Sequence, residues 1–169
     1  MDEIRRCFDF LHFQKEQYPL EDCMSNKIGS EWKNYSTEEV IKISNKLSQG
    51  LLNRGIEKGD RIAIISENRP EWLLTDLAIQ QIGAVSVPLY PNAVYNDYEY
   101  AFQHAEVKMV FFSSEEIGKK VQKAIGDKIE IHAFSFDKNP SNLYWEDVLI
   151  EADDKELESR REMVKPEDL

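Results

Sequence analysis

Short apolar runs that do not alternate with polar residues recur through the middle of the chain. They occupy residues 61–66, 85–88, 107–112 and 130–134. Strands covered by helices on both faces show this pattern, so the runs predict a parallel sheet. Apolar residues at helical spacing predict the helices between them, at 70–82, 96–105 and 114–125. Parallel strands joined by right-handed helical crossovers make an α/β fold, so we expect a doubly wound, mostly parallel sheet with helices on both faces.

The first third of the chain predicts a helix, a hairpin and a longer helix. Apolar residues at helical spacing over 4–18 end at Pro19, which predicts an amphipathic opening helix. Residues 23–28 and 32–35 flank a short connection that contains Gly29, which favours a β-hairpin. Ser36 and Glu39 have the spacing of a capping box, so a helix is expected from Thr37 to Arg54. The pattern weakens after Asn139, although 151–163 predicts a charge-rich helix.

Composition narrows the class of protein. The 169 residues suit one compact domain, and with 41% hydrophobic and 31% charged residues the chain is neither disordered nor membrane-spanning in character. A net charge of −11 opposes contact with phosphate backbones, which excludes nucleic acid as a partner. Cys7 and Cys23 form no CxxC pair and the N-terminus lacks a secretory pattern, so we expect a cytoplasmic protein with two buried thiols.

The usual catalytic and phosphate-binding motifs are missing from the sequence. The seven glycines have neither the spacing of a dinucleotide-binding turn nor that of a P-loop. His12, His104 and His132 are scattered, with no carboxylate or cysteine at metal-ligand spacing, and packing or surface roles suit them better. We therefore assign no residue of the chain to catalysis, cofactor binding or metal binding.

Two segments remain as candidates for contact with a ligand or a partner. The turn from Ser66 to Trp72 follows the first predicted sheet strand, where open α/β sheets bind ligands. Its structural interpretation is a helix start, with Asn68 or Arg69 before Pro70 and Trp72 packed inward. The loop from Tyr90 to Tyr95 follows a strand that we expect to stop pairing at Pro88 and Pro91. That loop either packs against helices or meets another domain or a cleft.

Several of these segments together resemble a known enzyme family. Residues 55–72, with Asn68-Arg69-Pro70-Glu71-Trp72 at their end, resemble the early signature of long-chain acyl-CoA synthetases. Residues 83–91 resemble the second core motif of that family, Trp32-Lys33-Asn34-Tyr35-Ser36 resembles the first, and 98–112 is similar to the helix and strand that follow. The resemblance covers about residues 7–112 well and the rest loosely, and the 68–72 turn favours the long-chain branch.

The resemblance implies an adenylate-forming ligase as the parent enzyme. In that family a fatty acid and MgATP give an acyl-adenylate and pyrophosphate, and the thiol of coenzyme A then displaces AMP. The family's phosphate loop, metal-binding acid, ribose-binding Asp and C-terminal Lys have no counterpart here, and residues 164–169 resemble the run-in to the phosphate loop. Residues 1–169 are therefore expected to be the N-terminal portion of the AMP-binding domain, inactive alone and without bound ATP, Mg²⁺ or CoA.

The resemblance also implies partners. These are the fatty acid substrate, the remainder of the ligase and a membrane surface touched peripherally by the parent. A chain cut from a larger domain should also expose apolar surface, so we expect the chain to self-associate. The alternative function is a stand-alone α/β module for ligand binding or interaction, without catalysis. A flavodoxin would need a Thr/Ser/Gly phosphate loop after its first strand, and a receiver a phosphoacceptor Asp after its third; Ser66-Glu67-Asn68 and Phe112-Ser113-Ser114 supply neither. A natural stop codon after Leu169 would favour a noncatalytic interaction domain.

Overall fold

A five-stranded parallel sheet forms the centre of the molecule in the computed structural model, which describes residues 4–127 and 130–168. The strand order is β4-β3-β5-β6-β7, and every neighbouring pair is parallel. This arrangement confirms the predicted sheet. The strands are β3 (Arg61–Ile65), β4 (Val85–Leu89), β5 (Val107–Phe112), β6 (His132–Ser135) and β7 (Leu143–Tyr144).

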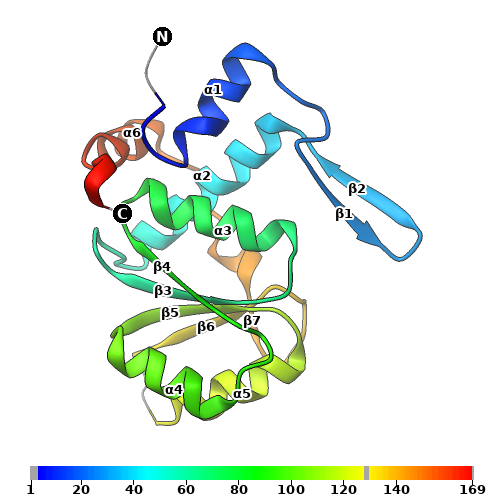
Figure 1. Cartoon of the computed structure of the whole chain (residues 1–169), viewed down its shortest axis with the longest axis vertical. Helices are drawn as coiled ribbons and strands as arrows, with labels where there is room; N and C mark the ends of the chain where they lie inside the picture. Colours follow the sequence, from blue (N-terminus) through cyan, green and yellow to red (C-terminus); the bar gives the residue numbers. More distant parts are fainter. Residues whose placement is uncertain (1–3, 128–129, 169) are drawn as a thin grey trace.

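Helices cover both faces of the sheet, as predicted (Figure 1). One face carries α2 (Thr37–Asn53), α3 (Pro70–Gln81) and α6 (Asp154–Glu162), and the other carries α4 (Tyr95–His104) and α5 (Glu115–Ile125). Side chains of β3 alternate between the two layers: Ile62 and Ile64 enter the first core, while Ala63 and Ile65 enter the second. Within 4–127 and 130–168, no helix combines the length and the apolar character that crossing a bilayer requires.

The N-terminal segments form a separate projection beside the first helical layer. Helix α1 (Asp9–Gln17) is shorter than predicted and lies next to α2, and β1 (Met24–Ile28) pairs antiparallel with β2 (Glu31–Tyr35). Gly29 has a φ of +63° in the connection, which explains a glycine at this turn. Figure 1 shows the hairpin extending away from the body of the molecule.

The predicted capping box starts α2. The backbone N–H of Glu39 donates to Ser36 Oγ at 3.2 Å, and the backbone N–H of Ser36 donates to Glu39 Oε2 at 2.8 Å. At the other end of the helix, Gly55 has a φ of +78°, a conformation that a glycine adopts without strain. Both ends of this helix therefore follow from local sequence signals.

The thiol prediction is wrong for Cys7. Its side chain is exposed, and Cys23 is half-buried, with its thiol donating to Gln14 Oε1 at 3.2 Å. The predicted helix placed Cys7 on an inward face, but α1 begins only at Asp9. Phe8, the residue directly before α1, is buried in place of Cys7. Both thiols are free, and only Cys23 contributes to packing.

Pro88 also differs from its prediction. It lies inside β4 and is in register with Ile64, so pairing continues to Leu89. Strand β4 is at the edge of the sheet, where a residue that lacks an N–H is tolerated because one side of the strand has no partner strand. The proline therefore marks an edge strand, and the sheet ends one residue later than expected.

The C-terminal third holds the elements that the sequence pattern predicted least well. Strand β6 is His132–Ser135, in register with Met109–Phe112, whereas the prediction was 130–134. Strand β7, the 3₁₀ helix η1 (Trp145–Val148) and the 3₁₀ helix η2 (Pro166–Asp168) were not predicted. The predicted helix 151–163 begins later, at Asp154, because the side chain of Asp153 caps the backbone N–H groups of Lys155 and Glu156.

Candidate functional site

The two candidate segments come together at the carboxyl end of the sheet. An open pocket of about 570 Å³ lies where β3 and β4 end. Because β3 and β4 are parallel neighbours, the turn after one and the loop after the other meet at the same edge. The lining residues are Ser66, Glu67, Asn68 and Trp72 from the first segment and Pro88, Leu89, Tyr90, Pro91 and Asn92 from the second.

Arg69 fixes the turn between β3 and α3. Its guanidinium forms ion pairs with Glu71 and Asp137, each at 2.8 Å, and lies 5.5 Å from the centre of the Phe136 ring. Burial disfavours the Arg69 cation, but hydrogen bonds to the two carboxylates outweigh it and raise the pKa of Arg69. Arg69 caps α3 without a side-chain bond, and Pro70 occupies the first turn. These residues therefore have the structural role that their sequence context indicated.

A buried tyrosine supports the loop on the other side of the pocket. Tyr98 is fully buried, and its hydroxyl lies 2.8 Å from the carbonyl oxygen of Tyr90 and 3.1 Å from that of Pro91. Burial, with a smaller contribution from the charge of Asp97, raises the pKa of Tyr98, so the hydroxyl keeps its proton and donates. Tyr98 lies within a predicted helix, and that position by itself indicates packing and not support of the loop.

Most side chains around the pocket are apolar or uncharged, but Glu67, which also lines it, carries an exposed carboxylate. Tyr90 is 81% exposed and Val94 is 59% exposed. Trp72, which was expected to pack inward, is only half-buried: it contacts the core and also lines the pocket. The Ser66 hydroxyl donates to the carbonyl oxygen of Glu67 at 2.8 Å and so is engaged locally. The pocket therefore offers mainly aromatic and apolar contact surface, together with one carboxylate, that of Glu67.

The described residues of the chain form no cluster that could bind a metal ion. Across 4–127 and 130–168, no cluster of three or more His, Cys, Asp or Glu side chains could hold a metal ion. The three histidines lie on α1, α4 and β6, where His104 stacks on Tyr100 with ring centres 5.3 Å apart. Burial and the charge of Arg161 lower the pKa of His12.

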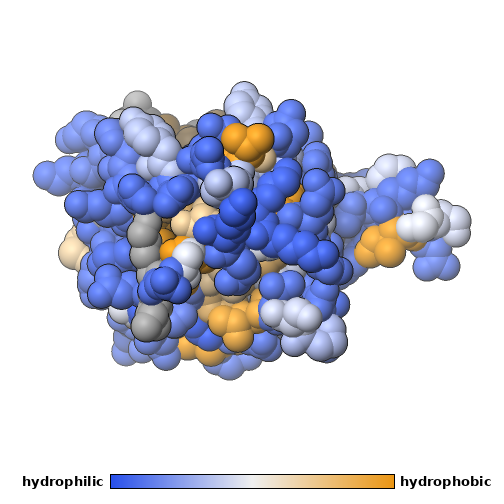
Figure 2. Space-filling view, turned by 90° about the horizontal axis from the view of Figure 1, so that it is seen from below, coloured by the Kyte–Doolittle hydropathy of each residue, from blue (hydrophilic) through white to orange (hydrophobic). Residues whose placement is uncertain are grey.

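A second hollow lies at the opposite end of the sheet, beside the start of β5. It has a volume of about 690 Å³, with Phe102, Val107 and Ile131 on its floor and acidic residues such as Glu106 and Asp127 around it. Figure 2, which faces the α4–α5 layer, shows hydrophobic residues between hydrophilic ones on that side of the molecule. The amino end of a parallel sheet is not where ligands usually bind, and the carboxyl-end pocket is the stronger candidate.

Comparison with known proteins identifies the family. Residues 11–169 match the family model described as AMP-binding enzyme. Fatty acyl-CoA synthetase A of Dictyostelium discoideum is 35% identical over 95 residues, 56% of this chain and 14% of that protein. Long chain acyl-CoA synthetase 5 of Arabidopsis thaliana is 31% identical over 124 residues, 69% of this chain and 18% of that protein. This chain therefore spans less than a quarter of the length of such relatives.

Solved structures agree on the fold. The coronafacic acid ligase from Pectobacterium brasiliense matches with a TM-score of 0.71 and 21% identity, over 88% of this chain and 30% of that one. At this identity the match establishes the fold alone, and it confirms the doubly wound sheet with helices on both faces. Since the family model covers residues 11–169, nearly the whole chain, this chain belongs to the AMP-binding enzyme family.

Proposed function

We propose that this chain is the N-terminal portion of an ATP-dependent long-chain fatty-acid–CoA ligase. The whole enzyme would join a fatty acid to coenzyme A, with ATP converted to AMP and pyrophosphate. The observation that carries this proposal is the similarity of the chain to proteins named fatty acyl-CoA or long chain acyl-CoA synthetases, at up to 35% identity.

The cofactors of such a ligase do not fit the residues of this chain. Phosphoryl chemistry needs positioned cations and amides around the triphosphate, and the sequence has no glycine-rich loop ending in lysine. The carboxylates at 4–127 and 130–168 form no three-ligand group for Mg²⁺. In the proposed enzyme, ATP, Mg²⁺ and CoA would therefore bind to residues outside this chain, and the chain would supply scaffold and contact surface.

The carboxyl-end pocket is the part of this chain that would face the rest of the ligase or its ligands. Its exposed Tyr90 and half-buried Trp72 offer aromatic surface, while Tyr98 and Arg69 hold their backbones in place. Large exposed aromatic groups beside a pocket are typical of contact sites. We also propose a cytoplasmic location with peripheral membrane contact of the whole enzyme, which fractionation of cells that express it would test.

Release of pyrophosphate from ATP tests the proposal. A panel of fatty acids of different length is offered to the 169-residue chain and to a version extended through the downstream reading frame. We expect turnover by the extended protein and none by the chain alone, because the chain has no groups to stabilise charge on the transferred phosphate.

Three outcomes would contradict parts of the proposal. Turnover by the 169-residue chain would mean that its active site has been overlooked. An extended protein that folds but activates no carboxylate would exclude the ligase function and favour a noncatalytic module. Activity only on acetate, aryl acids or amino acids would keep the adenylate-forming reaction and exclude the long-chain substrate.

A further inference from the structure

Most of the β1–β2 hairpin is exposed. Of its ten strand residues only Tyr35 is buried, while Ile28 is 59% exposed and Trp32 is 65% exposed. A two-stranded hairpin in water is marginally stable by itself. Figures 1 and 2 both show it extending beyond the body, and Figure 2 shows hydrophobic surface on it. The tip of this arm therefore leaves apolar surface open to a partner.

Apolar side chains lie on both faces of the hairpin tip. Lys27 is paired with Trp32, and Ile28 is paired with Glu31. Residues directly opposite share a face and successive residues alternate, so Trp32 and Ile28 point to opposite sides. A flat surface would cover only one of them. The tip therefore fits a slot that contacts both faces, and the free backbone edges of a two-stranded hairpin also suit added strands.

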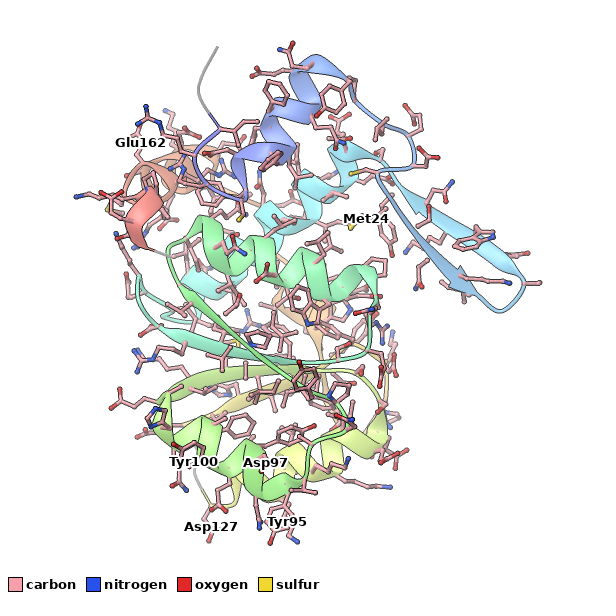
Figure 3. The ribbon with its side chains drawn as sticks, viewed as in Figure 1. Met24, Tyr95, Asp97, Tyr100, Asp127 and Glu162 are labelled. Carbon is pink, nitrogen blue, oxygen red and sulfur yellow. The ribbon has the colours of Figure 1, made fainter. Side chains whose placement is uncertain are left out.

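The base of the hairpin is fixed to the body next to the carboxyl-end pocket. Met24 lies between the hairpin and the helical layer (Figure 3) and packs against the core, and β1 contacts α3. Strand β2 contacts α2, and its Lys33 ammonium lies 4.7 Å from the centre of the ring of Tyr35, the buried residue at the end of the strand. Because Trp72 of the pocket is also on α3, hairpin and pocket occupy one side of the molecule.

We propose that the hairpin is a docking arm whose tip, Ile28 and Trp32, inserts into a slot formed by another part of the same ligase polypeptide. This rests on the proposed function, since the relatives are several times longer than this chain. One incoming segment would then cover both the arm and the exposed Tyr90 beside the pocket. Residues 32–36 resemble a core motif of acyl-CoA synthetases. In this proposal the part of that motif in β2 forms one strand of the docking arm.

Hydrogen exchange measured by mass spectrometry tests the arm without any substitution. Peptides over residues 24–35 are followed in the 169-residue chain and in the version extended through the downstream reading frame. We expect rapid exchange in the chain alone and a marked slowing in the extended protein, because buried strands open rarely. An extended protein that activates fatty acids while its hairpin exchanges as fast as in the short chain would overturn the proposal. Slowing in an extended protein that proves inactive would support the arm and exclude only the ligase function.

A double variant separates docking from folding of the chain itself. Ile28→Ser with Trp32→Ser should leave the thermal midpoint of the 169-residue chain unchanged, because both side chains are exposed there. It should lower the midpoint of the extended protein. Met163→Ser, at an exposed apolar residue after α6, is the matched control and should change neither. An unchanged midpoint in the extended protein would contradict the proposal.

Two further samples test other partners. Vesicles of phosphatidylserine and phosphatidylcholine added to the short chain should leave hairpin exchange unchanged, and so should a higher protein concentration. Slowing by vesicles would assign the arm to a lipid surface, and slowing with concentration would assign it to a second copy. Either result would overturn the proposal, while the absence of both supports it.

Discussion

Gly50 shows how closely α2 and the 3₁₀ helix η1 approach. A Cβ built at Gly50 would lie 1.7 Å from the carbonyl oxygen of Val148, which is backbone and cannot rotate away. Replacing an exposed helical glycine by alanine normally stabilises a helix by up to about 1 kcal/mol. Here we expect the opposite, a loss of about 1–3 kcal/mol, because η1 would have to shift.

Urea denaturation of Gly50→Ala measures this loss. Lys42→Ala, on an exposed position of the same helix, is the control and should stay within about 0.5 kcal/mol of the parent. A stabilised Gly50→Ala variant would show that the helices are further apart than the structure indicates.

Asp76 links stability to pH. Burial raises the pKa of its carboxyl above the ordinary 3.8, although hydrogen bonds from Ser86 and Gln80 oppose this. A carboxyl whose folded pKa is raised binds its proton more tightly when folded, so its contribution to stability is lost as pH rises from 3.8 through the folded pKa. The ionised side chain therefore has an electrostatic cost at neutral pH.

Asp76→Asn should remove that cost. The amide oxygen can still accept from Ser86 Oγ, and the NH₂ group can donate to Gln80 Oε1 once the Gln80 amide, whose Nε2 now donates to Asp76 Oδ2 at 2.6 Å, has turned over. We expect the variant to gain stability relative to the parent as pH increases from 4 to 8, measured by denaturant titration. The exposed Asp22→Asn is the control. A variant less stable than the parent at pH 8 would mean that the carboxylate charge is needed there.

At the scale of elements, the capping box makes the start of α2 testable. Ser36→Ala removes the acceptor for the backbone N–H of Glu39 and should cost about 1 kcal/mol. Ser30→Ala, in the exposed hairpin connection, should cost much less. Thermal and urea unfolding of the two variants compare these values. Equal effects at both positions would contradict a stabilising cap.

Elements were predictable where their signals are local. The buried strands lack alternation, and the helices between them have apolar faces and caps, so β3 to β5 and α2 to α5 lie within a few residues of their predicted positions. Strand β7 was missed because two residues, Leu143 and Tyr144, carry no periodic pattern. The position of β6 depends on register with β5, which is set by tertiary packing.

The candidate site was predictable in place but not in detail. Sequence placed the Ser66–Trp72 turn and the loop that begins at Tyr90 each after a parallel strand, and the structure shows that they meet because those strands, β3 and β4, are neighbours. The anchoring of that loop by Tyr98 depends on the distance from α4 to the loop. Similarly, Arg69 reaches Asp137, 68 positions later in the chain, and no local pattern predicts such a pair.

At the scale of the whole molecule, several exposed apolar residues lie on the edge strand β4 and on elements that flank it in the sequence. They lie on α3, on β4, in the loop after it and on α4, and comprise Leu73, Val85, Tyr90, Val94 and Tyr100. Figure 3 shows Tyr95 and Tyr100 on α4, in the helical layer that covers one face of the sheet. Exposed apolar surface next to an unpaired strand edge favours association. We therefore expect the chain alone to self-associate at high concentration, with the loop from Leu89 to Tyr95 as the contact.

Sedimentation velocity over a range of concentrations tests this expectation and its location. Tyr90→Ser with Val94→Ser should shift the chain toward monomer, whereas Met163→Ser should not, although Met163 is also 46% exposed. The net charge of −11 makes copies repel each other, so added salt should strengthen the association by screening that repulsion. Weakening by salt would instead indicate an ionic contact. A parent chain that stays monomeric at high concentration in both low and high salt would show that the exposed residues at this edge are too dispersed to hold two copies together.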